Sequence, residues 1–121
     1  MIKGIGTDII EISRIESAVE KEKFINEIYT KDEIEEFKKR KENITYLAGH
    51  FAAKEAVSKA LGTGMRGISF SDIEILSDEL GKPFVKIKKN GYENYIIHIS
   101  ISHSKENAIA FCVIENKQEE N

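Results

Sequence analysis

The stretch Phe51-Ala52-Ala53-Lys54-Glu55-Ala56-Val57-Ser58-Lys59-Ala60-Leu61-Gly62-Thr63-Gly64 carries most of the information about the fold. It predicts the second half of a long central helix, which Asn43 or Thr45 caps at its start and which runs to Leu61. Gly62 stands where a glycine ends a helix, because glycine adopts a left-handed backbone at little steric cost. We therefore expect this helix to form the centre of the domain.

Two charged residues of this helix, Glu55 and Lys59, lie one turn apart. The simplest interpretation is a surface ion pair, which stabilises a helix by about 0.2–0.5 kcal/mol. The small residues Ala52, Ala53, Ala56 and Ala60 lie near the pair. Such residues let a bulky ligand or another chain approach a helix closely, and a metal-binding glutamate with a lysine one turn beyond it suits a metal-bound phosphate. Gly64, which no helix end explains, is a candidate for close approach of the backbone to a ligand.

A second acid, Asp8, lies in the segment Gly4-Ile5-Gly6-Thr7-Asp8-Ile9. The β-branched and glycine residues predict a first strand over residues 2–7. From Asp8 to about Lys21, apolar residues recur at spacings of three and four, which predicts an amphipathic helix. Asp8 and Glu11 fit a capping box at the start of that helix. Alternatively, a carboxylate at a strand-to-helix junction can hold a hard cation, and the two roles are compatible because one oxygen can cap while the other ligates.

The pattern of the chain changes after Gly67. Before it, Thr30 and Glu33 fit a capping box that begins a short helix through Phe37. After it, alternation and turn residues predict strands over residues 73–76, 84–88, 96–101 and 108–114. We therefore predict an α+β fold, in which an antiparallel sheet packs with the long central helix and shorter N-terminal helices. Residues 1–121 are expected to form a single domain.

Composition bounds the function. The chain has 121 residues, 40% hydrophobic and 32% charged, with a formal net charge of −3. This charge is too near neutral for nucleic-acid binding by bulk attraction, and the one basic run, residues 38–41, is short and has no aromatic residues within it. No apolar run approaches the ~18 residues that span a membrane, and no signal peptide is recognisable, so we expect a soluble, cytoplasmic protein. Cys112 lies in an apolar run, which predicts a buried side chain rather than a reactive thiol.

The segment from His98 to His103 alternates isoleucine with polar residues. In a strand, His98, Ser100 and Ser102 share one face and the isoleucines share the other, because successive side chains alternate. His103 falls at the strand exit, where functional residues often lie. Histidine and cysteine residues are not clustered at the spacing of zinc ligands, so a zinc site is not expected.

Four blocks of the sequence, in this order, resemble a known family: residues 4–9, residues 51–64, Gly81-Lys82-Pro83, and residues 98–103. Together with the length of the chain, they strongly resemble the holo-acyl-carrier-protein synthases, the short bacterial 4′-phosphopantetheinyl transferases. The resemblance implies transfer of 4′-phosphopantetheine from coenzyme A to a serine of apo acyl carrier protein, with release of adenosine 3′,5′-bisphosphate, in support of fatty acid biosynthesis. It also implies a homotrimer with active sites between subunits.

The resemblance assigns roles to residues of the reaction centre. It implies that Asp8 and Glu55 hold magnesium, that Lys59 contacts the coenzyme A phosphates and that His103 lies near the adenosine 3′-phosphate. Phosphoryl transfer needs positioning and charge neutralisation more than covalent chemistry, and these groups supply both. We hypothesise that Glu55 also accepts the proton of the carrier serine, since it is the acid nearest the expected metal besides Asp8.

Further assignments concern the substrates. By the same resemblance, Arg14 meets the acidic carrier protein, and Phe24 adds an apolar contact. The chain departs from most relatives at His50, where the family carries an arginine that helps to hold the coenzyme A phosphates. We therefore expect His50 to line the coenzyme A site, and its replacement of the arginine concerns the strength of coenzyme A binding.

Two other functions remain compatible with the residues. A non-catalytic α+β trimer that binds an acidic helical partner is one, although such a module has no use for Asp8, Glu55 and Lys59. A phosphopantetheinyl transferase for carrier domains of polyketide or peptide synthases is the other, since carrier choice depends on surface details. Two carboxylates suit magnesium and manganese alike.

Overall fold

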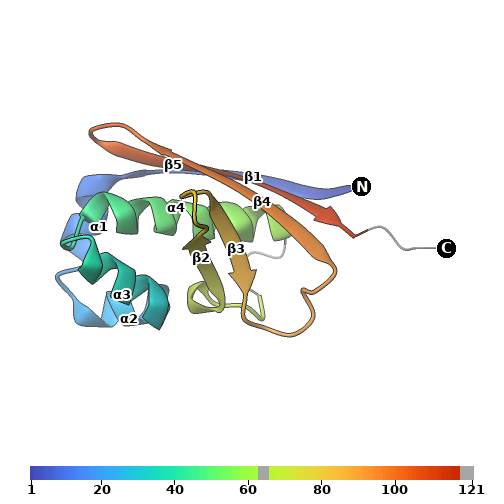
Figure 1. Cartoon of the computed structure of the whole chain (residues 1–121), viewed down its shortest axis with the longest axis horizontal. Coiled ribbons are helices and arrows are strands. Elements are labelled where there is room, and N and C mark those ends of the chain that lie inside the picture. The colour runs from blue at the N-terminus through green and yellow to red at the C-terminus, as the bar shows by residue number, and fades with distance from the viewer. Residues whose placement is uncertain (63–65, 118–121) are drawn as a thin grey trace.

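A computed structural model describes residues 1–62 and 66–117 of the chain (Figure 1). Its elements, in chain order, are β1 (Ile2–Glu11), α1 (Ile12–Ala18), α2 (Glu22–Ile28), α3 (Lys31–Lys39), α4 (Ile44–Leu61), the 3-10 turn η1 (Phe70–Asp72), β2 (Ile73–Ser77), β3 (Pro83–Ile87), β4 (Tyr95–His103) and β5 (Asn107–Asn116). The α+β fold class is confirmed. No helix within the described ranges is long and apolar enough to cross a membrane.

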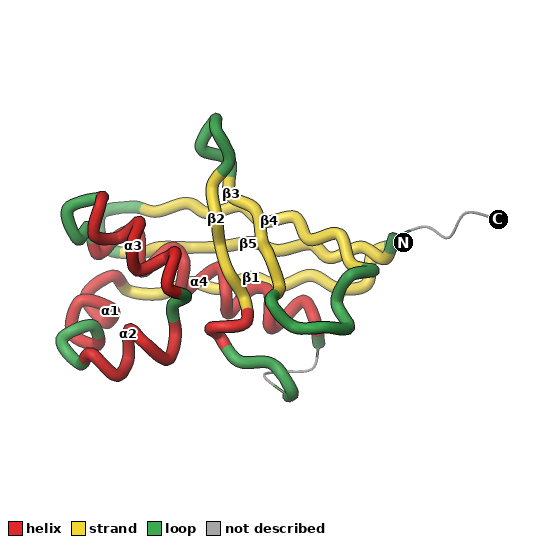
Figure 2. The backbone as a smooth tube through the Cα atoms, turned by 60° about the horizontal axis from the view of Figure 1, so that its bottom comes forward, coloured by secondary structure: helices red, strands yellow, loops and turns green. Residues whose placement is uncertain are grey.

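The strands form two antiparallel sheets rather than one. β1, β5 and β4 make the larger sheet with β5 in its centre, and β2 pairs with β3 in a separate hairpin. Figure 2 shows this hairpin running across the direction of the larger sheet's strands. Helix α4 lies along the inner face of the larger sheet, and α1 to α3 gather at one end of it (Figure 1).

The central helix α4 has the predicted ends. Asn43 caps it, because its side-chain oxygen accepts a hydrogen bond from the backbone N–H of Thr45 at 2.9 Å. Gly62 follows with a left-handed backbone, φ 73°. These two residues fix where the helix begins and ends, as the sequence indicated.

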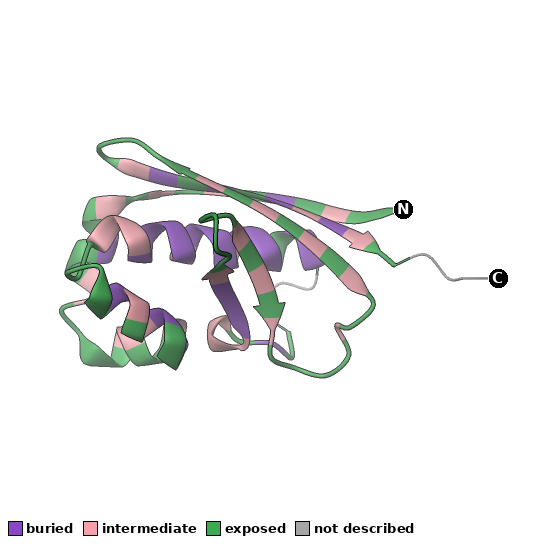
Figure 3. Ribbon diagram, viewed as in Figure 1, coloured by how far each residue is buried: buried purple, intermediate pink, exposed green. Residues whose placement is uncertain are grey.

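Strand β1 lies directly against the backbone of α4. A Cβ atom at Gly6 would come within 2.0 Å of the carbonyl oxygen of Ala56, and one at Gly4 within 2.0 Å of that of Ala60. Ala56 and Ala60 lie at this contact, and all the alanines of α4 are fully or almost fully buried within the chain (Figure 3). The expectation that these small residues admit a ligand or another chain is therefore wrong, because they admit the chain's own first strand.

The beginning of the chain differs from the prediction. β1 continues through Glu11, where Asp8 pairs with Ala110 of β5, and α1 begins only at Ile12. Asp8 is therefore not an N-cap, and no side chain caps α1. The sequence of residues 8–11 is compatible with the start of a helix and with a strand. Pairing with β5 makes this segment a strand, and residues 7–11 alternate in burial accordingly. A separate helix, α2, was not predicted.

The remaining elements confirm the sequence patterns. Thr30 and Glu33 form both hydrogen bonds of the capping box at the start of α3. β4 alternates between exposed and partly buried residues as expected, and His103 is its last residue. Cys112 is buried in the core, and burial raises the pKa of its thiol.

On β1 and β5, the outer face of the larger sheet carries exposed apolar side chains, whereas on β4 the same face is mostly polar. Ile5 and Ile9 of β1 are 62% and 64% exposed, and Ile109 and Phe111 of β5 are 42% and 48% exposed. Ile9 pairs with Ile109 across the strands, so these side chains form one continuous surface. We call Ile5, Ile9, Ile109 and Phe111 the outer apolar face.

Candidate functional site

Three of the predicted site residues meet in one pocket. The Nζ atom of Lys59 donates hydrogen bonds to Asp8 Oδ1 at 3.2 Å and to the carbonyl oxygen of Thr7 at 3.0 Å. Glu55 lies one turn before Lys59 on α4 and lines the same cavity of about 410 Å³. We call this cavity the metal pocket, after the group that its two carboxylates suit.

The fold explains why these residues converge. Gly4 and Gly6 let β1 approach α4 until their backbones touch, and Asp8 follows on the same inward face of the strand. The surface ion pair expected between Glu55 and Lys59 is not formed among the described residues, because Lys59 pairs with Asp8 instead. The contact between β1 and α4 thus builds the pocket.

The electrostatics of the pocket suit a cation. Burial raises the pKa of Glu55, and the nearby charge of Asp8 raises it further, while Lys59 opposes the shift. Two carboxylates that repel one another are stabilised when they share a divalent ion. Magnesium is usually held by one or two carboxylates together with waters and substrate phosphates, so a pair is sufficient. No group of three or more His, Cys, Asp or Glu side chains that could hold a metal ion occurs in residues 1–62 and 66–117.

The two residues expected to meet the carrier protein line the metal pocket as well. Arg14 comes from α1 and Phe24 from α2. Phe24 stacks on Phe51, with ring centroids 6.1 Å apart, so its ring also packs within the chain. Phe51 itself also lines the pocket, although no role there was predicted for it from the sequence. Its position at the head of the alanine-rich stretch was the available signal.

The two histidines lie in a second cavity, of about 390 Å³. His50 and His103 line it together with Arg40, Gly81 and Pro83. We call it the histidine pocket. Among residues 1–62 and 66–117, none lines both pockets, and His103 lies in a different cavity from Asp8 and Glu55. Arg40 was not predicted, although the basic run 38–41 contained it. Gly64 lies outside the described residues.

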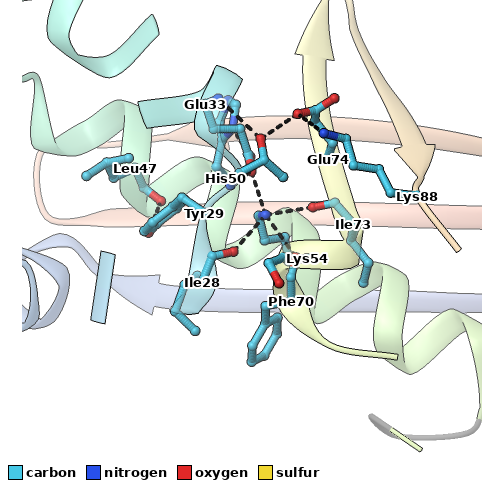
Figure 4. A network of polar contacts seen from close by, with 12 residues as sticks. Ile28, Tyr29, Glu33, Leu47, His50, Lys54, Phe70, Ile73, Glu74 and Lys88 are labelled. Carbon is cyan, nitrogen blue, oxygen red and sulfur yellow. Dashed lines mark hydrogen bonds and ion pairs between the residues drawn. The ribbon is translucent and has the colours of Figure 1, made fainter. Parts of the chain in front are cut away.

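A buried polar network adjoins the histidine pocket (Figure 4). Its centre is Glu33, whose side chain is fully buried. Glu33 accepts hydrogen bonds from Lys54 Nζ at 2.6 Å and from His50 Nδ1 at 2.8 Å. Burial alone would raise the pKa of Glu33, but the hydrogen bond from His50 and the charge of Lys54 outweigh it and lower the pKa. The sequence identified Glu33 as a capping residue only.

Lys54 ties three segments of the chain together. Its ammonium group, which is also fully buried, donates to the carbonyl oxygens of Ile28, Phe70 and Ile73 as well as to Glu33 (Figure 4). It thus connects α4 to the end of α2, to η1 and to β2. Since Glu55 is the next residue, this network also holds the metal pocket's side of α4 in place.

Comparisons of sequence and of structure with known proteins all match the same enzyme family. Residues 4–112 match the family model of the 4′-phosphopantetheinyl transferase superfamily. A holo-[acyl-carrier-protein] synthase of Clostridium botulinum (strain Alaska E43 / Type E3) is 57% identical over 121 residues, which cover 95% of this chain and 98% of that protein. The crystal structure of a holo-(acyl-carrier-protein) synthase from Bacillus anthracis in complex with CoA (3′,5′-ADP) is 45% identical, with a TM-score of 0.85 over 97% of this chain and 99% of that one. A Helicobacter pylori holo-[acyl-carrier-protein] synthase in complex with coenzyme A is 37% identical, with a TM-score of 0.83 over 92% of this chain and 99% of that one.

Proposed function

Because the chain belongs to the 4′-phosphopantetheinyl transferase superfamily, we propose that it transfers 4′-phosphopantetheine from coenzyme A to a serine of apo acyl carrier protein. In this reaction the serine Oγ forms a bond to one phosphorus of the coenzyme A pyrophosphate. The bond from that phosphorus to the oxygen of the leaving group breaks, and adenosine 3′,5′-bisphosphate departs. The observation that carries the proposal is the convergence of Asp8, Glu55 and Lys59 in one pocket.

The residues of the metal pocket divide the work. Asp8 and Glu55 would hold magnesium, which supplies charge neutralisation at the phosphate oxygens when it is bound. Lys59 places its ammonium group beside the same carboxylates and donates to a phosphate oxygen. Glu55 accepts the proton of the serine, a role that its raised pKa supports, since a base is most effective when its pKa lies nearer the working pH.

Coenzyme A binding needs both pockets. We assign the phosphates of coenzyme A to Lys59 and to His50 and His103 of the histidine pocket. We also assign to Gly64 a close approach of the protein backbone to coenzyme A. Because no residue of the described ranges lines both pockets, a site that uses both is most simply formed between two copies of the chain.

This arrangement favours a homotrimer with the reaction centres between subunits. The outer apolar face supports it, because a monomer would leave these isoleucines and Phe111 in water. A closed symmetric assembly buries the same surface on every copy. The number three rests on the resemblance to the family.

The carrier protein docks beside the metal pocket. Arg14 contributes a positive charge toward an acidic partner, and Phe24 an apolar surface, both at the cavity that contains the carboxylate pair. A carrier for fatty acid biosynthesis in the cytoplasm is the substrate that the family implies. A non-catalytic binding module would leave unexplained why Asp8 and Glu55 share a pocket with Lys59.

The experiment that tests the reaction is intact mass spectrometry of an apo acyl carrier protein. The carrier is incubated with the chain, coenzyme A and magnesium, in parallel with a sample that contains EDTA. A mass gain of one phosphopantetheine that EDTA abolishes supports both the transfer and its metal dependence. No gain on several apo carrier proteins, with folded enzyme, would favour the binding module.

A further inference from the structure

Glu33 makes three hydrogen bonds with no exposure to solvent. Its Oε2 accepts from His50 Nδ1 at 2.8 Å, while its Oε1 accepts from Lys54 Nζ at 2.6 Å and from the backbone N–H of Thr30 at 2.9 Å (Figure 4). Three donors on one buried carboxylate keep it ionised. The anion therefore lies permanently at one edge of the His50 ring.

This contact fixes the form of the His50 ring. A carboxylate accepts a hydrogen bond, so Nδ1 carries the proton in the neutral imidazole and Nε2 is the nitrogen that gains a proton on ionisation. His50 is only 7% exposed and lines the histidine pocket. With Nδ1 committed to Glu33, Nε2 is the ring nitrogen that remains for a ligand in that pocket.

The surrounding charges make the protonation of His50 depend on the ligand. Within the network, Glu33 is balanced by Lys54 and Glu74 by Lys88, whose Nζ lies 3.2 Å from Glu74 Oε2. With both carboxylates already paired with lysines, a proton on His50 would give the network one more positive charge than negative charges, even though Glu33 lies beside the ring. A bound anion compensates that charge, so anion binding and protonation favour one another.

Two further side chains near His50 are Tyr46 and Arg40. Tyr46 packs on the ring, with centroids 4.0 Å apart, and burial together with the charge of Glu33 raises the pKa of Tyr46, so it stays neutral. Arg40 lies over Tyr46, with its guanidinium carbon 4.9 Å from the ring centroid, and lines the histidine pocket with His103. The described lining of this pocket contains Arg40, His50 and His103 and no carboxylate. Arg40 Nε donates to Glu36 of α3 at 2.9 Å, and a guanidinium group has four further N–H donors for an anion.

We propose that His50 takes up a proton when a phosphate group binds in the histidine pocket, and that Glu33 is the positioning residue that permits this uptake. The inference rests on the proposed function, since the phosphate belongs to coenzyme A or to adenosine 3′,5′-bisphosphate. It makes substrate affinity rise as the pH falls. A permanently charged group in the same place would show no such dependence.

The test measures the affinity for adenosine 3′,5′-bisphosphate between about pH 6 and pH 9 by isothermal titration calorimetry. Wild type is compared with His50→Asn, because the asparagine amide nitrogen replaces Nδ1 as the donor to Glu33 and does not titrate. The ionisation of the ligand phosphate and of His103 is common to both proteins and cancels in the ratio of affinities. We expect wild type to bind about tenfold more tightly at pH 6, as one charge-assisted hydrogen bond allows, and the ratio to approach one at pH 9.

A second variant tests Glu33 itself. Glu33→Gln keeps the shape and one acceptor but removes the charge that favours a protonated ring. The fall of wild-type-like affinity with rising pH should then begin at lower pH. Circular dichroism checks that the variant is folded, and Glu35→Gln, an exposed glutamate on the same helix that does not line the histidine pocket, serves as the matched control. A variant that merely loosens the fold weakens binding at every pH and does not move the profile.

The inference fails if the ratio of wild-type to His50→Asn affinities is the same at every pH, or if both bind equally at pH 6. Calorimetry in buffers of different ionisation enthalpy gives an independent reading, because wild type and His50→Asn would then take up the same number of protons on binding. If carrier modification is nevertheless observed, the proposed function stands and only the role of His50 and Glu33 falls. Absence of both ligand binding and carrier modification would overturn the proposed function and the inference together.

Discussion

Lys59 Nζ lies 3.2 Å from Asp8 Oδ1 across 51 positions of sequence, and this ion pair joins β1 to α4 at the metal pocket. The carboxylate of Asp8 is mostly buried, with 17% of its side chain exposed, while Lys59 is 54% exposed. Lys59 can therefore turn toward a substrate, whereas Asp8 stays fixed. A metal ion at Asp8 and the ammonium group of Lys59 repel each other unless a phosphate lies between them.

The first prediction follows from that repulsion. Lys59→Met should strengthen Mn²⁺ binding to the enzyme without coenzyme A, by a factor of a few, while it slows carrier modification at least about tenfold, because a phosphate contact is lost. Electron paramagnetic resonance of free Mn²⁺ measures the binding. Lys23→Met, which removes an exposed helix ion pair elsewhere, is the control. Weaker Mn²⁺ binding in Lys59→Met would contradict the account.

The second prediction concerns Glu55 and pH. Burial and the charge of Asp8 raise the pKa of Glu55 in the folded protein. A carboxyl with a raised folded pKa favours folding when protonated, and this contribution is lost as the pH rises through that pKa. At pH 7 the charged Glu55 therefore costs stability. Glu55→Gln should increase the free energy of unfolding at pH 7 in EDTA. The gain should shrink as the pH falls through the raised pKa of Glu55 and vanish below about pH 4.3, the ordinary pKa of glutamate.

Urea titrations at both pH values measure this difference. Added magnesium should stabilise wild type and leave Glu55→Gln unchanged, because a ligand stabilises only the protein that binds it. A Glu55→Gln variant that is less stable than wild type in EDTA would contradict the assigned cause of the shift.

The third prediction concerns the close contact of β1 with α4. Gly6→Ala places a Cβ atom 2.0 Å from the carbonyl oxygen of Ala56, so the strand must move away from the helix. We expect a loss of at least about 2 kcal/mol in the free energy of unfolding, together with loss of transfer, since Asp8 moves with the strand. Gly49→Ala is the matched control for stability alone, because Gly49 lines the histidine pocket. Its Cβ atom would meet only the side chain of Ile101, at 3.1 Å, and alanine favours the helix.

The fourth prediction addresses assembly. Phe111→Asp places a charge in the centre of the outer apolar face, where 48% of the residue is exposed in the single chain. Sedimentation velocity should show a smaller species than wild type, and carrier modification should fall with it if the reaction centre lies between subunits. Leu80→Asp changes a 95% exposed apolar residue in the β2–β3 turn and should leave the assembly intact. A Phe111→Asp protein with wild-type size and activity would remove the support for a subunit interface here.

The fifth prediction concerns the carrier protein. Arg14→Glu reverses a charge that lines the metal pocket from α1. Steady-state kinetics should show a raised KM for the acidic carrier and an unchanged KM for coenzyme A. Equal increases in both would indicate a distorted pocket instead of a docking contact.

The sequence predicted those features that local chemistry determines. Asn43 and Gly62 marked the ends of α4 because capping needs only neighbouring residues. The strands of the second half followed from alternation. The position of Asp8 was wrong for a physical reason: residues 8–11 fit either a helix start or a strand, and pairing with β5, about a hundred residues away, decides between them.

The site was predictable in its members but not in its arrangement. Asp8, Glu55 and Lys59 were identified, yet the pairing of Lys59 with Asp8 depends on the glycine contact between β1 and α4. The buried network of Glu33, His50 and Lys54 has no local pattern, because its members meet only after α3 packs on α4. The sequence pattern of Glu33 indicates a capping residue and gives no sign of its hydrogen bonds with His50 and Lys54.

The measurement that tests the central claim most directly compares carrier modification by wild type, Asp8→Asn and Glu55→Gln. Intact mass spectrometry follows an apo acyl carrier protein with coenzyme A and magnesium, at equal concentrations of folded enzyme. The account predicts a gain of one phosphopantetheine with wild type and none on the same time scale with either variant. Modification at the wild-type rate by Glu55→Gln would show that the reaction does not depend on the carboxylate pair.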